Sequence, residues 1–229
     1  FYDIIKLSDN RVGLVIADVS DKGIPAALYM TVARTLIRSN AAGGSSPAEV
    51  LEEVNKLLLN DSSDAMFITT VYAILNLETG EMLYANAGHN RPLLFRRKKG
   101  DVEQLPKGGT ALGVLDDLKL ENHKITIQPG ESLILYTDGV TDALAPDGSF
   151  FGESRLFNLI KMHGKEHIRE TLEYLDDALI EFRRGTPPMD DITLLAVQRE
   201  TIQRKSGRQR KQAPESGKFD AAKNEEQVS

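Results

Sequence analysis

The sequence contains no cysteine, and this absence removes several kinds of chemistry. Disulfides and thiolate zinc sites are excluded, and so is catalysis by a cysteine nucleophile. No apolar run is long enough to cross a bilayer, and no secretory signal opens the chain. We therefore expect a cytoplasmic protein without membrane insertion.

Acidic residues outnumber basic ones over most of the chain. The net charge is −6, and seven of the 28 Lys and Arg fall after Glu200, against four acidic residues there. An acidic body argues against nucleic acid as the main partner, because phosphate backbones attract positive surfaces. Such a body suits a site that gathers divalent cations.

The composition is that of one folded domain with a polar extension. The chain has 229 residues, of which 41% are hydrophobic and 27% are charged, which allows a sizeable core. We expect the domain to span residues 1–199 and the polar residues 200–229 to form a disordered tail. The basic run from Arg204 to Lys211 favours a solvated tail over a binding arm. The chain opens at Phe1 without a Met, so we expect a fragment of a longer protein.

Hydrophobic periodicity predicts an α+β fold. Strands are expected at 1–6, 12–17, 67–77, 81–87, 91–96, 102–105, 119–127, 132–137 and 192–199. Helices are expected at about 25–40, 47–58, 153–163 and 166–183. Turn residues at 78–80, 88–90, 99–101 and 128–130 indicate hairpins, which imply antiparallel pairing. The simplest arrangement is two antiparallel sheets with helices laid on the outside.

Three acids stand at the ends of predicted strands. One apolar run ends in Asp18 and another ends in Asp138, whereas Asp190 precedes the last strand. If that strand runs antiparallel to the other two, the three carboxylates meet at one edge of the sheet. Gly139 permits a tight turn beside them.

Carboxylates this close repel one another unless a cation lies between them. Oxygen ligands on a rigid sheet edge suit Mg²⁺ or Mn²⁺. Two such ions can share a water and make it hydroxide near neutral pH, and hydroxide can attack phosphorus in line. No serine nucleophile with a His/Asp partner is evident among the four scattered histidines. The residues alone therefore favour hydrolysis of a phosphate monoester.

Four motifs, in this order, resemble those of a known family. They are Ile16-Ala-Asp-Val-Ser-Asp-Lys-Gly-Ile-Pro-Ala-Ala27, Tyr84-Ala-Asn-Ala-Gly-His-Asn90, Tyr136-Thr-Asp-Gly-Val-Thr-Asp142 and Asp190-Asp-Ile-Thr193. Together they resemble the SpoIIE-type branch of the metal-dependent protein phosphatases (the PPM family). The resemblance runs from Phe1 to about Arg199 and leaves out the tail.

The resemblance implies a β-sandwich flanked by pairs of helices, with a binuclear Mn²⁺ or Mg²⁺ centre between the sheets. It implies that Asp18 bridges both ions beside the backbone carbonyl of Val19. Asp138 and Asp190 would hold the first ion, and Asp191 would support these ligands without binding. The catalytic nucleophile would be a metal-bound water held by Asp18 and Asp138.

The resemblance also implies partners. The substrate would be phosphoserine or phosphothreonine on a STAS-type anti-sigma-factor antagonist, within bacterial partner-switching signal transduction. In the longer protein we expect an upstream sensor or receiver domain, and a homodimer is compatible with the sequence.

Two departures from the family pattern bear on activity. Members usually begin with Gly-Gly-Asp-Phe-Tyr-Asp, whereas this sequence begins at Phe1 and lacks the first acid, so we expect a weakened second metal site. Eukaryotic relatives carry a histidine just after the bridging acid, where this chain has Ser20. Metal-bound water would then protonate the leaving oxygen.

Alternatives stay open at this point. A catalytically impaired domain could bind a phosphoprotein, although the three intact acids disfavour it. A phosphoaspartate enzyme would need alternating strand and helix units, which the hairpin-rich centre lacks. His89-Asn90 is interpreted as a structural turn, Asp142 as a cap, and Asp21 and Lys22 as surface charges or substrate contacts. Apolar residues 28–30 are expected in the core.

Overall fold

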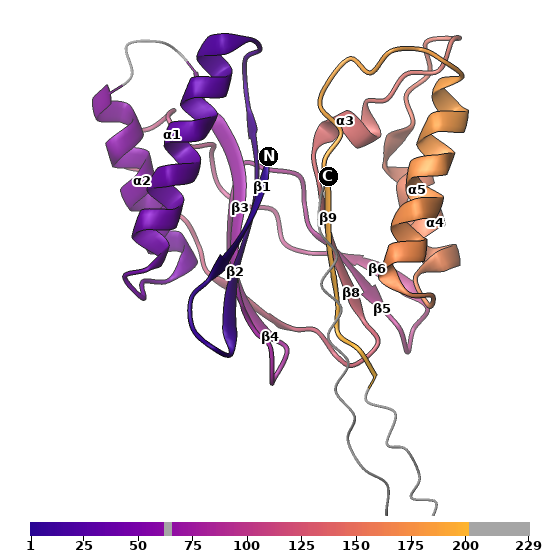
Figure 1. Ribbon diagram of the computed structural model, residues 1–229, viewed down its shortest axis with the longest axis horizontal. Helices are drawn as coiled ribbons and strands as arrows, with labels where there is room; N and C mark the ends of the chain where they lie inside the picture. Colours follow the sequence, from indigo (N-terminus) through magenta and orange to yellow (C-terminus); the bar gives the residue numbers. More distant parts are fainter. Residues whose placement is uncertain (62–65, 202–229) are drawn as a thin grey trace, which may run out of the picture.

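The computed structural model describes residues 1–61 and 66–201. Its strands form two antiparallel sheets that face one another, and helices cover the outer face of each sheet (Figure 1). Sheet A has the strand order β1-β2-β3-β4-β7, and sheet B has the order β6-β5-β8-β9. This α+β sandwich is the predicted architecture. The predicted tail lies outside the described residues from position 202 onward.

The first part of the chain builds most of sheet A and its two helices. Its elements are β1 (Tyr2–Lys6), β2 (Arg11–Val19), α1 (Ile24–Ala41), α2 (Pro47–Asp61), β3 (Ile68–Asn76) and β4 (Glu81–Ala87). The remainder builds sheet B and its helices, apart from β7, which returns to the edge of sheet A. Its elements are β5 (Leu93–Arg96), β6 (Asp101–Gln104), β7 (His123–Thr126), β8 (Ser132–Tyr136), α3 (Asp138–Thr141), α4 (Gly152–His163), α5 (Ile168–Arg183) and β9 (Leu194–Gln198).

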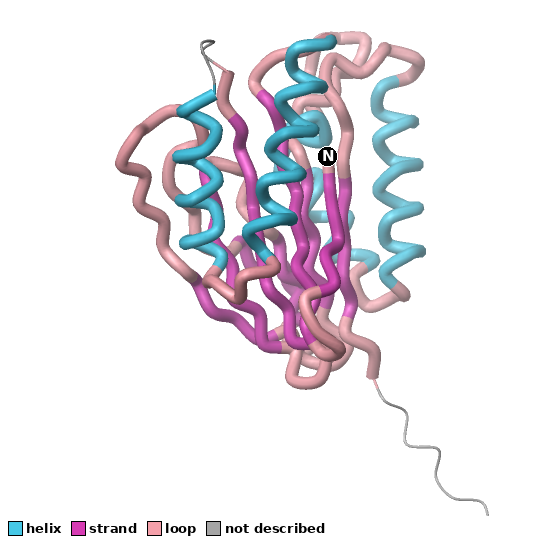
Figure 2. Tube along the Cα trace, turned by 60° about the vertical axis from the view of Figure 1, so that its left-hand side comes forward, coloured by secondary structure: helices cyan, strands magenta, loops and turns pink. Residues whose placement is uncertain are grey.

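Alternation of side chains along the strands explains the layers seen in Figure 2. In β2, Leu14 and Ile16 belong to the apolar cluster between the sheets. Val15 and Ala17 belong to the cluster between sheet A and helices α1 and α2. A third cluster lies between sheet B and helices α4 and α5. A strand buried on both faces has a continuous apolar sequence, which is why the apolar run before Asp18 clearly predicted a strand.

The two helices on sheet A differ in how well their buried faces were predicted. In α2 the expected residues Val50 and Val54 are buried, and Ser46 N donates a hydrogen bond of 2.8 Å to Glu49 Oε2 in a capping box. In α1, Leu28 was expected in the core but is 63% exposed, whereas Tyr29 is buried. The α1 face on the sheet is otherwise mostly small: the buried residues are Ala26, Tyr29, Ala33, Ile37 and Ala41. Small residues let the helix lie close to the sheet. A prediction based on large apolar residues therefore chose the wrong face of α1 as the buried one.

Two predicted hairpins are crossovers between the sheets instead. Residues 88–92 connect β4 of sheet A to β5 of sheet B, and residues 127–131 connect β7 of sheet A to β8 of sheet B. Local turn chemistry does not reveal whether the next strand pairs with the last one or crosses to another sheet. The hairpins predicted at 78–80 and 99–101 are confirmed by the antiparallel pairs β3–β4 and β5–β6.

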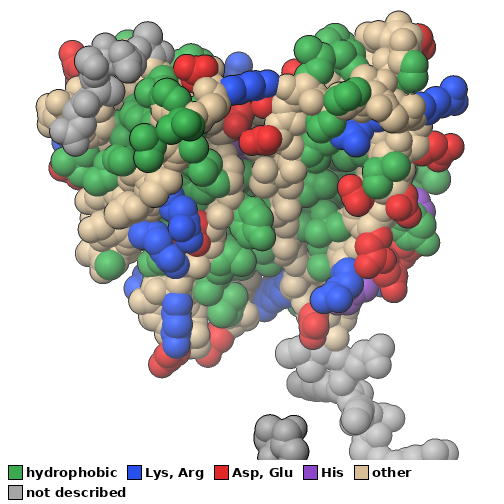
Figure 3. All heavy atoms as spheres, turned by 45° about the horizontal axis from the view of Figure 1, so that its top comes forward, with side chains coloured by type: hydrophobic (Ala, Val, Ile, Leu, Met, Phe, Trp, Pro, Cys, Tyr) green, Lys and Arg blue, Asp and Glu red, His purple; other side chains and the backbone are tan. Residues whose placement is uncertain are grey.

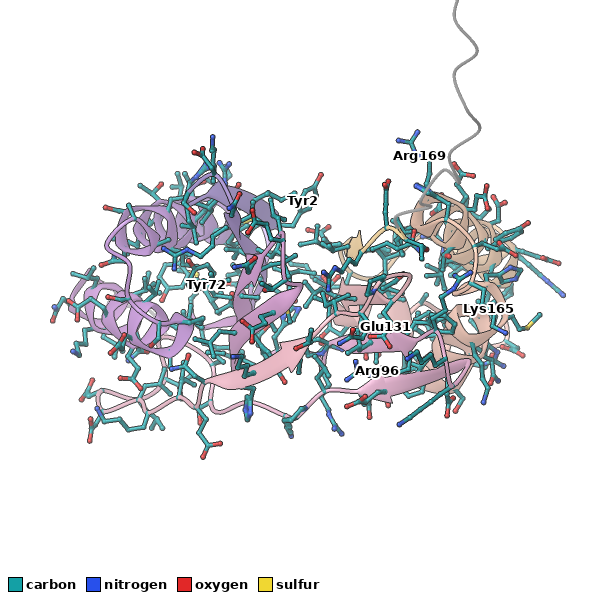
Figure 4. The ribbon with its side chains drawn as sticks, turned by 90° about the horizontal axis from the view of Figure 1, so that it is seen from below. Tyr2, Tyr72, Arg96, Glu131, Lys165 and Arg169 are labelled. Atoms are coloured by element: carbon teal, nitrogen blue, oxygen red, sulfur yellow. The ribbon has the colours of Figure 1, made fainter. Side chains whose placement is uncertain are left out.

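A buried ion pair fixes the second crossover, at the start of β8. Arg96 Nη1 donates a hydrogen bond of 2.9 Å to Glu131 Oε2, and Figure 4 shows the two side chains close together on sheet B. Gln128 N donates to the same carboxylate oxygen at 3.0 Å. Glu131 is only 7% exposed, so its charge depends on these donors. Within the described part of the chain, no helix has the length and apolar character needed to span a membrane.

Candidate metal centre

A cleft of about 380 Å³ opens at the end of the sandwich, between the loop after β2 and the loop before β9. Its lining includes four acidic residues and one lysine: Asp18, Asp21, Asp190, Asp191 and Lys22. Figure 3 shows acidic and basic side chains gathered at the groove between the two halves of the molecule. The two walls of the cleft therefore come from different sheets.

Asp18 is held inside sheet A. Strand β2 extends to Val19, so Asp18 is its second-last residue, whereas the sequence placed it just after the strand. Its register partner in β3 is Thr69, and it shares the inner face of the sheet with Ile16. Partial burial raises the pKa of the Asp18 carboxyl, and the negative charges of Asp138 and Asp190 raise it further.

Asp138 opens the short helix α3 directly beyond β8. Four residues are too few for hydrophobic periodicity, so the sequence gave no sign of this helix. Although the side chain is exposed, crowding by nearby protein atoms raises the pKa of Asp138, and the charges of Asp142 and Asp190 add to the rise. Asp142 follows the last residue of α3, and its N–H donates to the Asp138 carbonyl at 2.8 Å, consistent with the predicted cap.

Asp190 lies in the loop ahead of β9, so it precedes the last strand as predicted. The loop is tied to the end of β8 through Thr137, whose hydroxyl donates to the Asp191 carbonyl at 2.8 Å and accepts from Thr193 N at 2.9 Å. Asp191 N donates to Asp190 Oδ1 at 2.9 Å. These bonds place Asp190 beside the start of α3, and with it beside Asp138.

Gly139 is required by close packing of this loop. A Cβ added at Gly139 would collide with the Asp191 carbonyl oxygen and lie 2.9 Å from its carbonyl carbon. The sequence suggested a turn that needs glycine for its backbone angles, but Gly139 lies in α3 and is not among the glycines with positive φ. The glycine serves instead to let the two backbones approach.

The donor set fits a divalent cation by its chemistry. Asp18 and Asp138 repel one another and Asp190, and hard carboxylate oxygens are the ligands that Mg²⁺ and Mn²⁺ prefer. Among residues 1–61 and 66–201, no three His, Asp or Glu side chains are arranged as a group that could hold a metal ion. The ligand set of Asp18, Val19, Asp138 and Asp190, with Asp191 in support, therefore stays a prediction.

Comparison with known proteins identifies the family. The family model described as Stage II sporulation protein E (SpoIIE) matches residues 8–200. The chain belongs to the SpoIIE family. The four motifs recognised in the sequence are thus confirmed as those of the SpoIIE-type branch of the PPM phosphatases.

Two curated relatives of this SpoIIE-family chain are longer than the region it matches. Protein IcfG of Synechocystis sp. is 31% identical over 226 residues, and phosphoserine phosphatase RsbU of Bacillus subtilis is 29% identical over 199 residues. Each match covers 87% of this chain but only 35% of IcfG and 58% of RsbU. The chain spans about a third to three fifths of the length of these relatives.

Solved structures confirm the predicted PPM fold of the SpoIIE-family domain. The RsbU and RsbW domains of a Mycobacterium tuberculosis protein match with a TM-score of 0.72 and 27% identity, over 87% of this chain and 55% of that chain. The SiaA-PP2C domain of Pseudomonas aeruginosa matches with a TM-score of 0.73 and 25% identity, over 86% of this chain and 78% of that chain.

Lys22 lies at the mouth of the cleft between the loop after β2 and the loop before β9. Its Nζ is 3.6 Å from Asp190 Oδ1 and donates a hydrogen bond to the Met189 carbonyl. The sequence left open whether Lys22 was an ordinary surface charge. The structure places it across the cleft, where it joins the loop after β2 to the loop before β9.

His89 was considered in the sequence, but its surroundings could not be predicted from it. It was interpreted as part of a hairpin turn, but it lies in the crossover between the sheets and is 4% exposed. Its Nδ1 is 2.8 Å from the hydroxyl oxygen of Thr69, the register partner of Asp18. Burial lowers the pKa of His89 to about 4, against the smaller opposing influence of the Tyr136 carbonyl. No spacing rule could have found this contact, because it depends on where the chain changes sheets.

Proposed function

We propose that residues 1–199 form a metal-dependent serine/threonine protein phosphatase domain. The observation that carries the proposal is the cleft of about 380 Å³ in which Asp18 from sheet A faces Asp190 and Asp191 from the loop before β9. The charges of Asp138 and Asp190 add to the rise in the pKa of Asp18 that burial causes. Family membership supports the proposal, since the relatives RsbU and RsbP of Bacillus subtilis are named phosphoserine phosphatases.

The proposed metal ligands come from both sheets. A binuclear Mn²⁺ or Mg²⁺ centre supplies, when bound, an activated water and charge neutralisation at the phosphoryl oxygens. Asp18 and the Val19 carbonyl would hold it from sheet A, and Asp138 and Asp190 from the side of sheet B. The hydrogen bonds of Asp191 with Thr137 and Asp190 keep this second wall in place.

The side chain of Ser20 does not replace the general acid of the eukaryotic relatives. Ser20 Oγ accepts a hydrogen bond of 3.0 Å from Phe67 N, and Ser20 N donates to the Phe67 carbonyl at 3.0 Å. The residue therefore joins the ends of β2 and β3. Protonation of the leaving alkoxide falls to water at the site.

The proposed substrate is a phosphoserine or phosphothreonine on a regulatory protein, with a STAS-type anti-sigma-factor antagonist as the expected class. The cleft opens at the rim of the sandwich, where Asp190 and Lys22 are exposed. Asp138 is exposed at the start of α3, outside the cleft lining. A phosphorylated side chain on a folded protein can reach such a rim. We propose regulation by a sensor or receiver domain elsewhere in the longer protein.

Phosphate release tests the proposal directly. The purified chain and a version extended at its N-terminus should release phosphate from a phosphorylated STAS protein and from an aryl phosphate with Mn²⁺, and EDTA should stop release. Asp138→Asn should lower the rate by about 100-fold or more, since metal catalysis contributes several kcal/mol. Asp177→Asn, at an exposed position of α5, serves as the charge-matched control.

Two results would overturn the proposal. Equal rates with Mn²⁺ and with EDTA would exclude metal-dependent hydrolysis, and so would full activity of Asp138→Asn. Tight binding of the phosphorylated protein by the extended chain, without any turnover, would identify a catalytically impaired binding domain instead.

A further inference from the structure

We propose that His89 is a positioning residue that orients the hydroxyl of Thr69 behind Asp18. The inference rests on the proposed function, because it concerns how Asp18 is kept ready to bind a cation. Asp18 and Thr69 are direct partners in the β2–β3 register. Direct partners in an antiparallel pair place their side chains on the same face, with Cβ atoms about 5 Å apart.

The His89 ring is fixed in place from its own backbone. His89 N donates a hydrogen bond of 2.8 Å to Asn86 Oδ1, and Asn86 Nδ2 donates to the His89 carbonyl at 3.0 Å. Asn86 is 1% exposed and His89 is 4% exposed, so water does not compete for these bonds. The ring therefore presents Nδ1 to the Thr69 hydroxyl in a fixed position, at 2.8 Å.

The second ring nitrogen decides which way that hydrogen bond runs. In the described part of the chain, His89 Nε2 is buried and has no hydrogen bond of ordinary geometry. The Tyr136 backbone carbonyl raises the pKa of His89, and because Nδ1 already faces Thr69 we take Nε2 as the nitrogen that faces this carbonyl. A neutral imidazole carries one proton, and a proton on Nε2 leaves Nδ1 as an acceptor. The Thr69 hydroxyl is then the donor to His89.

This direction has a consequence for Asp18. The Thr69 hydroxyl has a single hydrogen, and while His89 accepts it the hydrogen cannot point to the Asp18 carboxylate. Both carboxylate oxygens of Asp18 then stay available to a cation. If the ring lost this acceptor, Thr69 could donate to Asp18 and lower its strength as a ligand.

His89 also lies between the two sheets. Thr69 belongs to sheet A, and Tyr136 is the last residue of β8 in sheet B, two positions before Asp138. Residues behind metal ligands typically change metal affinity or activity by about 10- to 100-fold when replaced. A histidine that only filled space would instead affect stability and leave the affinity of the folded protein unchanged.

The tautomer can be measured without any metal. We expect nitrogen NMR of imidazole-labelled protein at pH 7 to show His89 as the Nε2–H form, with its signals identified by their absence from His89→Asn. The other described histidines are His123, His163 and His167, so the spectrum stays simple. A proton on Nδ1 would overturn the proposal, because Thr69 would then be the acceptor.

Metal affinity tests the link to Asp18. By titration calorimetry with Mn²⁺, Thr69→Val and His89→Leu should bind about 10- to 100-fold more weakly than the wild type. Thr69→Ser keeps the hydroxyl and should restore most of the affinity, and His89→Asn, whose Oδ1 can accept in place of Nδ1, should lose less than His89→Leu. Urea unfolding of each variant separates affinity from folding.

The outcomes distinguish the two proposals. If the wild type neither binds Mn²⁺ nor hydrolyses phosphate esters, the proposed function fails, and this inference fails with it. If the wild type binds Mn²⁺ and folded Thr69→Val binds it equally well, the role of His89 is refuted while the phosphatase proposal stands.

Discussion

Lys22 Nζ lies 3.6 Å from Asp190 Oδ1, so a residue that follows β2 of sheet A is paired with an acid that precedes β9 of sheet B. The side chains are 69% and 43% exposed, and an exposed ion pair of this kind contributes little to stability. The pair matters because of where it lies. It keeps a positive charge at the mouth of an acidic cleft, which under the proposed function would admit a phosphate dianion.

Lys22→Gln should therefore raise KM for a phosphorylated protein by about 2- to 5-fold and leave kcat nearly unchanged, since an exposed charge interaction contributes up to about 1 kcal/mol. The effect should shrink at high salt. Steady-state kinetics at low and high ionic strength measure both effects. Lys6→Gln, which removes an exposed lysine paired with Asp9, is the matched control. An unchanged KM at low salt would show that Lys22 does not attract the substrate.

Asp138→Asn should stabilise the metal-free protein while it removes activity. The pKa values of Asp18 and Asp138 are raised in the folded protein, so at neutral pH their charges oppose folding. This opposition is relieved as pH falls toward the raised pKa values, where the folded state takes up protons first. We expect the melting temperature in EDTA to rise on substitution, and the wild type to gain more than the variant from mild acidification. A lower melting temperature for Asp138→Asn would contradict this account.

Gly139→Ala should disturb the loop that carries Asp190 and Asp191. The new methyl group would meet the Asp191 backbone, which cannot move without breaking its bonds to Thr137. Overpacking of this kind costs about 1–3 kcal/mol, and Mn²⁺ affinity should fall as the loop shifts. Gly43→Ala is the control, because its nearest neighbour would be the Asn40 carbonyl at an ordinary 3.4 Å. Urea denaturation and calorimetry measure the two effects, and equal stability of both variants would refute the packing argument.

His89 should make stability depend on pH in the mildly acidic range. Its pKa falls from 6.5 to about 4 on folding, so between these values the unfolded chain binds a proton that the folded chain does not. Stability is then lost as pH falls from about 6.5 toward 4, by up to roughly 3 kcal/mol. His89→Asn should flatten this part of the curve of unfolding free energy against pH.

The sequence predicted those parts of the site that depend only on neighbouring residues in the chain. An apolar run that ends in Asp18 needs only a buried strand, and the order of strands and helices, apart from the short helix α3, followed from periodicity. What sequence could not supply was the change of sheet at residues 88–92, because the same turn residues serve a hairpin and a crossover. The burial of His89 and its contact with Thr69 depend on that change. The clash that requires Gly139 likewise depends on a backbone about 50 residues further along the chain.

The two walls of the cleft meet only because apolar side chains such as Leu14 and Ile16 pack between the sheets. Asp18 and Asp138 are thus drawn together by a core that must close against their mutual repulsion. A zinc finger needs its metal to fold, whereas this domain has three apolar clusters that can form its core without one. A cation at this edge would be captured after the sheets have assembled. The folding order that the architecture implies is core first and ion last.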